Sequence, residues 1–396
     1  MQGNAIVGQS GGPTAVINSS LCGVIQGSLA SARIDRIYGM RWGIEGFLQD
    51  QIDDLGNESP RTIEALRRTP SSALGSCRYK LVESDLPRVL DLLATHDIRY
   101  LFLIGGNDTM DTVHRVERYC RDHGYDLTGI GIPKTVDNDL HGTDHTPGYG
   151  SAARYVALSI QQAGRLADDM QKVDRFVIHQ TVGRNVGWLA AAAALGKRRE
   201  EEAPHLIYLP ERPLSRARVL EEVRACVDAY GWASVVCGEG IVWDDGSPVS
   251  ASKTQDRFAN IEYGAMGGTS AAIALHHLIA QETGLRGEFQ ITESLAMCAI
   301  DRASESDLAE AYACGRRAVE LAERGESGLM VTIVRGGSLP YGVSYGSVPL
   351  HEVAERAKPL PDSFIAASGS FVTPAFLDYA RPLVGELPEY PVLRHR

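Results

Sequence analysis

Two carboxylates two residues apart, with a lysine close by, make residues 133–139 the segment best suited to chemistry. The segment reads PKTVDND. In extended backbone, residues two apart point to the same face, so Asp137 and Asp139 would lie together. Phosphoryl transfer needs a carboxylate that accepts the proton of the attacking hydroxyl, a carboxylate near Mg²⁺, and a cation such as Lys134 on the charged oxygens. The alternative interpretation is an ordinary surface turn stabilised by its Asp side chains.

Two glycine-rich turns add sites where a ligand could meet the backbone. Residues 8–14 read GQSGGPT and residues 105–109 read GGNDT. Glycine lets the backbone approach an anion closely, and Pro13 suits the first position of a helix whose N-terminus would attract that anion. Asp108 places a carboxylate where a metal ion could sit. Turns needed only for packing, and Asp108 acting as a helix N-cap, are the alternatives. Neither a G-x-G-x-x-G nor a Walker A motif is present.

Alternating strands and helices must position these turns. The sequence predicts an α/β fold with two Rossmann-like three-layer α/β/α domains and mostly parallel sheets, in which ligands bind at the carboxyl ends of strands. We predict a first domain over residues 1–140, rejoined by about 298–345, a second over 141–297, and a C-terminal extension over 346–396. Strands are expected at 4–8, 35–40, 100–104, 127–132, 175–179, 205–209, 234–237 and 329–334, and helices at 13–29, 84–94, from 108, 149–166, 186–195 and 308–323.

Composition narrows the class of protein. Hydrophobic residues make up 44% and charged residues 22% of the 396 residues, and the net charge is −11. An acidic chain argues against a nucleic-acid binder. The seven cysteines are scattered without a C-x-x-C pair, which argues against a zinc site and a disulfide framework and fits a reducing cytoplasm. The start of the chain lacks the pattern of a signal peptide, and the apolar run 188–195 is too short to cross a bilayer. We therefore expect a cytoplasmic protein with no membrane contact.

Read in order, these segments resemble the phosphofructokinase family. Its members carry Gly-Gly-x-x-Ser/Thr after one strand and Pro-Gly/Lys-Thr-Ile/Val-Asp-Asn-Asp after the next, as residues 105–109 and 133–139 do here. Further matches are LGSCR at 74–78, TDHTPGYG at 143–150, VGRNVGW at 182–188 and CGEG at 237–240. The resemblance runs from Gly8 to about Glu239, and residues 301–335 look like the family's C-terminal helix and strand.

The resemblance implies roles for individual residues. Asp137 matches the catalytic base, and Lys134, Asp108 and Arg184 are expected to assist it. Arg175 matches a phosphate-binding arginine that the family lends across a subunit interface, which implies a homodimer or homotetramer. The remaining expected contacts are Gly11, Gly12, Arg78, Gly106, Asn107 and Thr109 with the donor, Thr135, Asp139, Val182, Gly183 and Glu239 with the acceptor, and Asn107, Asp108 and Asp139 with Mg²⁺.

The expected donor is pyrophosphate. ATP-using members resemble G-G-D-G-S and P-G-T-I-D-N-D. Here Asp108 replaces the last glycine of the first motif and Lys134 replaces the glycine of the second, as in pyrophosphate-using members. Asp108 would repel the α-phosphate of ATP, and Lys134 would neutralise a compact anion. The resemblance implies a Mg²⁺-dependent, reversible transfer from pyrophosphate to the 1-hydroxyl of fructose 6-phosphate, giving fructose 1,6-bisphosphate and phosphate in glycolysis.

Three departures from the family pattern keep alternatives open. Asn107 stands where the family has an aspartate for Mg²⁺, and Val182 replaces a methionine. Residues 294–297, SLAM, fall where the family binds the sugar 6-phosphate through Tyr/His-x-Gln-Arg. Losing one charged contact costs about 1.5–3 kcal/mol unless Arg286 or Arg302 compensates. The alternatives are another sugar phosphate or a polyol as acceptor, an ATP-dependent kinase, and a non-catalytic regulatory subunit.

Overall fold

A seven-stranded sheet forms the N-terminal lobe of the computed structural model, which describes residues 1–250, 269–292, 294–354 and 356–393. The strand order is β11-β10-β5-β4-β1-β2-β3. The central strands are parallel, and β3 and β11 are antiparallel to their neighbours. The strands are β1 (Gly3–Gln9), β2 (Ile34–Met40), β3 (Ile52–Asp54), β4 (Ile98–Gly105), β5 (Thr128–Pro133), β10 (Leu329–Ser338) and β11 (Tyr341–Pro349).

Helices cover both faces of this sheet because its strands are apolar on both sides. On β4, Tyr100 and Phe102 pack toward α1 (Ile17–Ala30) and α12 (Glu305–Glu323). The alternate residues Leu101 and Leu103 pack on the other face, against the helices α4 (Leu86–Thr95) and α5 (Asn107–Asp122). Three short helices complete this lobe: α2 (Gly43–Phe47), α3 (Pro60–Leu66) and α13 (Leu350–Ala354).

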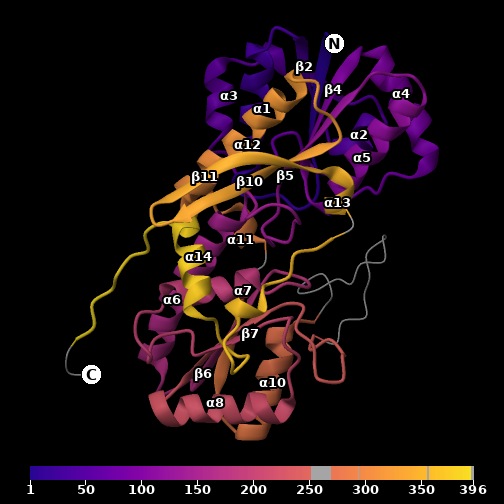
Figure 1. Ribbon diagram of the computed structural model, residues 1–396. Coiled ribbons are helices and arrows are strands. Elements are labelled where there is room, and N and C mark those ends of the chain that lie inside the picture. The colour runs from indigo at the N-terminus through magenta and orange to yellow at the C-terminus, as the bar shows by residue number, and fades with distance from the viewer. Residues whose placement is uncertain (251–268, 293, 355, 394–396) are drawn as a thin grey trace.

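A smaller parallel sheet forms the second lobe, below the first in Figure 1, with strand order β7-β8-β6-β9. One face packs against α6 and α7, and the other against α8 and α10. The prediction of an α/β fold with two three-layer, mostly parallel halves is confirmed. The elements are α6 (Tyr149–Met170), β6 (Phe176–Thr181), α7 (Trp188–Ala192), β7 (Leu206–Tyr208), α8 (Arg216–Tyr230), β8 (Ala233–Gly238), α10 (Ala271–Thr283), β9 (Gly287–Ile291) and α11 (Leu295–Cys298).

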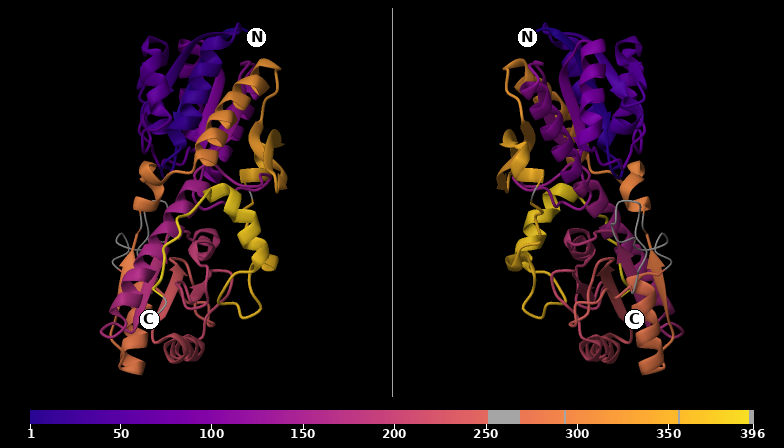
Figure 2. Two further views of the ribbon diagram at one scale, coloured as in Figure 1. Left: turned by 90° about the vertical axis from the view of Figure 1, so that its left-hand side faces the viewer. Right: turned by 90° about the vertical axis from the view of Figure 1, so that its right-hand side faces the viewer.

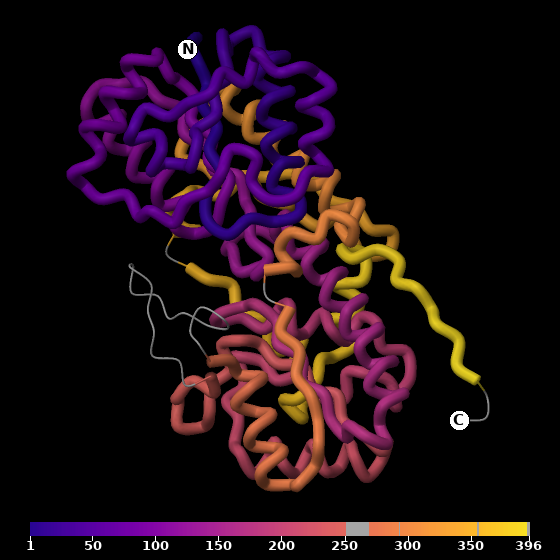
Figure 3. The backbone as a smooth tube through the Cα atoms, turned by 180° about the vertical axis from the view of Figure 1, so that it is seen from behind, coloured from indigo at the N-terminus to yellow at the C-terminus, as the bar shows by residue number. Residues whose placement is uncertain are grey.

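The C-terminal part of the chain passes from one lobe to the other, as the two side views of Figure 2 show. After β11 and α13, the chain enters the core of the second lobe through Leu360, Ile365 and Phe376. Helix α14 (Pro374–Val384) ends this passage, and the following residues run along α6, where Gln161 Nε2 donates to Pro388 O at 2.8 Å. The path is also visible from behind in Figure 3. The predicted domain boundaries themselves stay a prediction.

Two local predictions are wrong. The helix expected from Ser84 begins at Leu86 instead, because Ser84 lies inside a 3₁₀ turn (Glu83–Asp85) that precedes α4. Helix α1 begins at Ile17, with no side-chain cap at Val16, so Pro13 lies outside it. Among the described residues, no helix is both long and apolar enough to cross a membrane. All seven cysteines are free.

The buried carboxylate of Asp307, on α12, holds the start of α6. Its two oxygens accept hydrogen bonds from Gly148 N at 2.9 Å and Ser151 N at 2.8 Å. Buried amides of a helix N-terminus need such acceptors. We expect Asp307→Ala to lower the free energy of unfolding by about 2–4 kcal/mol, because two buried donors lose their partner. Chemical denaturation measures this loss.

Glu305 offers a control on the same helix. Its carboxylate pairs with Arg68 at 2.6 Å, but both side chains are exposed. Glu305→Ala should change the free energy of unfolding by about 1 kcal/mol at most. Equal losses in the two variants would contradict the role given to Asp307.

Candidate active site

The carboxyl ends of three neighbouring strands bring the predicted turns together. Strands β1, β4 and β5 are adjacent and parallel, and end at Gln9, Gly105 and Pro133. The segments that carry Gly11 and Gly12, Gly106 to Thr109, and Lys134 to Asp139 therefore leave the same edge of the sheet. This is the edge at which ligands bind in α/β proteins.

The ammonium group of Lys134 joins two of these turns. Lys134 Nζ donates to Gly12 O at 2.6 Å, and its backbone N donates to Gly105 O at 3.1 Å. A Cβ added to Gly11, whose φ is +78°, would stand 3.2 Å from Nζ, so glycine leaves room for the ammonium. The side chain is only 4% exposed. Burial lowers the pKa of Lys134 to about 8, although the charges of Asp137 and Asp139 oppose this shift.

The first glycine turn offers fewer free amides than its sequence suggests. Ser10 N donates to Ile104 O and Gly11 N donates to Cys77 O, both at 3.0 Å. The helix that follows begins several residues later, so its N-terminus does not open onto this turn. The predicted helix start at Pro13 is therefore wrong, whereas anion binding by this turn stays a prediction, with Lys134 supplying a positive charge beside it.

Asp137 has the environment of a general base. Burial raises its pKa to about 7, and the carboxylates of Asp139 and Glu239 add to the shift, while Arg184 and Lys134 oppose it. A base whose pKa lies near neutrality can accept a proton from a hydroxyl and release it again. The pKa of Asp139 is also raised, chiefly by burial.

The backbone between the two carboxylates is held in a left-handed conformation. Asn138 has a φ of +56° and is fully buried. Its Nδ2 donates to the Tyr379 hydroxyl at 3.0 Å, and its Oδ1 accepts from Thr146 N at 3.1 Å. Asp137 N donates to Thr135 Oγ1 at 3.1 Å. Asparagine tolerates this conformation better than most residues. Sequence reasoning assigned no role to Asn138, although its place between two aspartates was a signal.

The second lobe contributes the predicted acceptor residues. Val182, Gly183 and Arg184 follow β6, and Glu239 follows β8, so all four leave carboxyl ends of that sheet. Gly183 N donates to Glu239 Oε1 at 3.3 Å. Because the charges of Glu239 and Arg184 shift the pKa of Asp137, this carboxylate lies near them, where the two lobes meet. The predicted acceptor residues and base therefore meet at one place.

Asp108 lies at the rim of the site. It stands in the first turn of α5, its side chain is 80% exposed, and its nearest cation is Lys80 at 3.9 Å. The N-cap of α5 is Gly106, so the interpretation of Asp108 as an N-cap is wrong.

Two other residues predicted to contact the donor differ in exposure. Arg78 is exposed, yet its charge contributes to the lowered pKa of Lys134. Thr109 is buried against Gly105, where an added Cβ would clash at 2.1 Å.

Asn107 is the best candidate for a metal ligand. Its Nδ2 donates to Arg356 O at 3.4 Å, while its buried Oδ1 has no hydrogen-bond partner in the described parts of the chain. An unpaired amide oxygen fits a hard cation. The described residues include no group of three or more His, Cys, Asp or Glu side chains that could hold a metal. Mg²⁺ at phosphate-binding sites needs only one or two protein ligands beside the substrate phosphates, so a site with Asn107 as a ligand fits Mg²⁺.

Two arginines precede strands of the second sheet, at the ends opposite the site, and a third contacts α6. Arg175 precedes β6, at the end opposite Val182, and its Nε donates to Gly231 O at 2.7 Å. Arg286 precedes β9 and pairs with Asp174 at 2.9 Å. Arg302 donates to Ser159 Oγ at 3.1 Å and lies over the Tyr155 ring. These contacts occupy both arginines named as replacements for the missing Gln-Arg pair.

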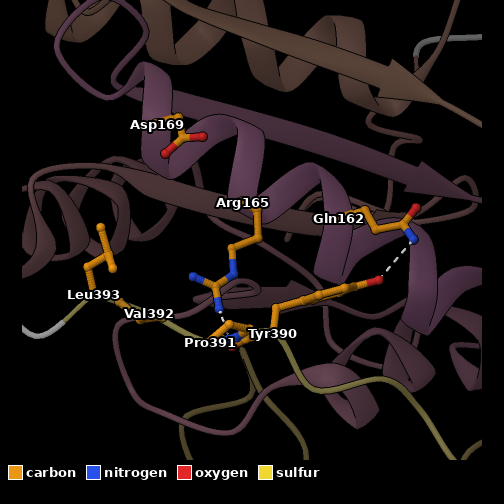
Figure 4. Close-up of a pocket in the computed structure, with 7 residues that line it drawn as sticks. All are labelled: Gln162, Arg165, Asp169, Tyr390, Pro391, Val392 and Leu393. Atoms are coloured by element: carbon orange, nitrogen blue, oxygen red, sulfur yellow. Dashed lines mark hydrogen bonds between the residues drawn. The ribbon is translucent and has the colours of Figure 1, made fainter.

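Residues 294–297 do approach the site. The side chain of Met297 lies beside the first glycine turn, because a Cβ added to Gly12 would stand 3.9 Å from Met297 Sδ. An apolar group therefore borders the turn, and it comes from the segment expected to correspond to the family's 6-phosphate site. A hollow of about 550 Å³ lies elsewhere, between α6 and residues 390–393, and contains none of the predicted site residues (Figure 4).

Comparison with known proteins agrees with this geometry. Residues 4–321 match the family model Phosphofructokinase. The chain is 38% identical to a pyrophosphate–fructose 6-phosphate 1-phosphotransferase of Halomonas elongata, covering 97% of this chain and 92% of the relative. A sulfofructose kinase of Alkalicoccus urumqiensis is 36% identical, with 91% of each chain covered. The crystal structure of a pyrophosphate-dependent phosphofructokinase from Marinobacter aquaeolei superimposes with a TM-score of 0.88 at 38% identity, covering 100% of this chain and 94% of that one. The chain therefore belongs to the phosphofructokinase family, and within it to the pyrophosphate-dependent group.

Proposed function

We propose that this protein transfers a phosphoryl group from pyrophosphate to the 1-hydroxyl of fructose 6-phosphate, reversibly, as a Mg²⁺-dependent cytoplasmic enzyme of glycolysis. The observation that carries the proposal is that a half-buried carboxylate, Asp137, lies near a buried ammonium, Lys134, so that each charge opposes the pKa shift of the other, at the edge where three glycine-rich or acidic turns meet. The full-length relative from Halomonas elongata carries that activity in its name.

In this proposal each residue has one task. Asp137 accepts the proton of the sugar hydroxyl as the hydroxyl oxygen attacks the phosphorus, and Arg184 lies near the base on the acceptor side. Lys134, already bonded to Gly12 O, neutralises the leaving phosphate. Asn107, with Asp108 or Asp139, would hold Mg²⁺, which supplies further charge neutralisation on the pyrophosphate oxygens when bound.

The assembly is proposed to be at least a homodimer. Arg175 and Val182 stand at opposite ends of β6, roughly 20 Å apart in an extended strand. Arg175 is thus too far along the strand to serve the site of its own chain, and we propose that it serves the site of a neighbouring copy.

Removing the base carboxylate tests the reaction. Asp137→Asn should lower kcat by about 10²–10⁴-fold, since the proton has no acceptor, with little change in either KM. A coupled assay for fructose 1,6-bisphosphate, with pyrophosphate as donor, measures the loss. Asp126→Asn, an exposed aspartate of the same lobe, is the control. A wild-type protein that makes no bisphosphate from millimolar substrates would exclude fructose 6-phosphate as the acceptor.

The pH profile of kcat/KM should show the titration of both Asp137 and Lys134. Asp137 must be ionised, so kcat/KM should fall as the pH drops below about 7. Lys134 must be protonated, so kcat/KM for pyrophosphate should fall as the pH rises above about 8. The profile is then a bell whose two apparent pKa values belong to the coupled site. Lys134→Met should remove the alkaline limb and raise the KM for pyrophosphate about ten- to hundredfold, whereas Lys80→Met, at the exposed rim, should keep the bell. An unmodified protein that works faster with ATP would refute the choice of donor.

The metal requirement can be tested at one residue. Removal of Mg²⁺ by a chelator should abolish turnover. Asn107→Asp should lower the Mg²⁺ concentration for half-maximal activity by about tenfold, because a carboxylate binds a hard cation more strongly than an amide, and Asn107→Leu should raise it by a similar factor. Asn57→Leu, at an exposed position, is the control. Identical Mg²⁺ titrations for the three variants would contradict the assignment.

A second candidate keeps the donor and changes the acceptor. Met297 borders the site where the family has an arginine for the sugar 6-phosphate, and one long relative is named a sulfofructose kinase. A sugar that carries a sulfonate, with a single negative charge, has less need of that arginine. We expect a comparison of kcat/KM for fructose 6-phosphate and 6-deoxy-6-sulfofructose to decide between the two. Met297→Arg should favour the phosphorylated sugar by about tenfold or more if the acceptor's charged end lies there.

A further inference from the structure

Residues 356–360, here called the crossover segment, touch three parts of the site as the chain passes from the upper to the lower lobe in Figure 1. Arg356 O accepts from Asn107 Nδ2 on the donor side. Lys358 O accepts from Trp188 Nε1 at 3.1 Å, just after the acceptor loop 182–187. Leu360 N and Gly187 N both donate to Glu211 Oε1, at 3.0 and 2.9 Å. A segment far along the chain is thus built into the surroundings of the reacting groups.

Lys358 makes the contacts closest to the base. Its backbone N donates to Asp139 O at 2.7 Å, and Ala357 forms an antiparallel bridge with Leu140. Its ammonium donates to Asp144 O at 2.8 Å, to Thr143 O at 3.1 Å, and to Asn138 Oδ1 at 3.5 Å. The ammonium of Lys358 therefore binds both ends of the segment 138–144, which follows Asp137 in the chain.

Tyr379 also binds Asn138. Its hydroxyl accepts from Asn138 Nδ2 at 3.0 Å and donates to Asp144 O at 2.9 Å. Both side chains come from beyond the family's matched region, which ends at residue 321. The left-handed Asn138 is the joint between the two site carboxylates, so whatever fixes this residue also fixes the direction of Asp137.

We propose that Lys358 is a positioning residue, which holds Asn138 together with Tyr379 and thereby aims the Asp137 carboxylate at the acceptor hydroxyl. The inference rests on the proposed function, in which Asp137 is the base. Lys358 then contributes to the rate of proton transfer without binding either substrate.

Lys197 provides a matched control. Its ammonium also donates to three backbone carbonyls, those of Glu200, Glu202 and Pro204, and burial lowers its pKa to about 8, as it does for Lys358. It lies in the 197–202 turn of the second lobe, which holds none of the site residues. Loss of either ammonium should cost comparable stability, but only the loss of Lys358 should reach the reaction.

The experiment measures kcat, both KM values and thermal unfolding for Lys358→Met, Tyr379→Phe and Lys197→Met. We expect Lys358→Met to lower kcat by about a hundredfold, the effect of misplacing a reacting group by about 1 Å, with both KM values within about threefold of wild type. Tyr379→Phe should lower kcat about tenfold. Lys197→Met should keep kcat within about twofold, although its melting temperature falls. Should Lys358→Met fail to fold, Tyr379→Phe carries the same test through the loss of one hydroxyl.

A double variant separates this proposal from the function on which it rests. If Lys358 acts through Asp137, then Asp137→Asn with Lys358→Met should be no slower than Asp137→Asn alone, within about twofold. Full additivity of the two losses would overturn the positioning role while leaving the base assignment intact. A rise of tenfold or more in either KM, with kcat retained, would instead make Lys358 a substrate contact. A fully active Asp137→Asn would overturn both proposals.

Discussion

The buried ammonium of Lys134, bonded to Gly12 O at 2.6 Å, is the contact on which the arrangement of the site depends. It fixes the turn after β5 against the turn after β1. A buried cation is costly unless negative groups compensate for lost hydration, and Asp137 and Asp139 supply that compensation. The compensation is mutual, because the same ammonium limits the rise in the pKa of Asp137. The pKa of Asp137 is raised to about 7 and that of Lys134 is lowered to about 8, and each charge limits the shift of the other.

The two residues that suggested a small donor now carry unequal weight. Sequence reasoning treated Asp108 and Lys134 as a pair that together exclude nucleotides. In the structure Lys134 is buried at the turn, whereas the Asp108 side chain is 80% exposed and faces Lys80. An exposed charge is screened by water and salt, and a buried one is not. Under the proposed function, the choice of a compact anion would therefore depend more on the buried ammonium of Lys134 than on Asp108.

Local sequence patterns predicted many of the strands and helices. Contacts between residues far apart in the chain decided where helices begin and which side chains reach the site. The apolar runs of β4 and β5, each closed by glycine or proline, identified the edge of the sheet where the site lies. Nothing local, however, distinguishes a helix that starts at Pro13 from one that starts at Ile17, because the choice follows from packing. Arg286 and Arg302 seemed close to the missing phosphate contact along the chain. Strand direction places Arg286 at the opposite end of β9, and α6 engages Arg302, so sequence proximity misled.

The C-terminal part of the chain joins the two halves of the site through paired charges and polar side chains. Asp144 lies between Arg335 and His145, and His145 Nε2 lies 2.6 Å from Glu310 Oε2. Burial works against the ionised form of Asp144, but bonds from His145 and Arg335 hold its pKa at about 2. Networks of this kind add little net stability relative to apolar packing, yet they tolerate only one geometry. Asp144 O also accepts hydrogen bonds from Lys358 Nζ and the Tyr379 hydroxyl. The network therefore positions the two side chains that bind Asn138. The loop that carries Asp137 and Asn138 is thus held by residues 220 and 241 positions further along the chain, which explains why the motifs alone could not reveal how it is held.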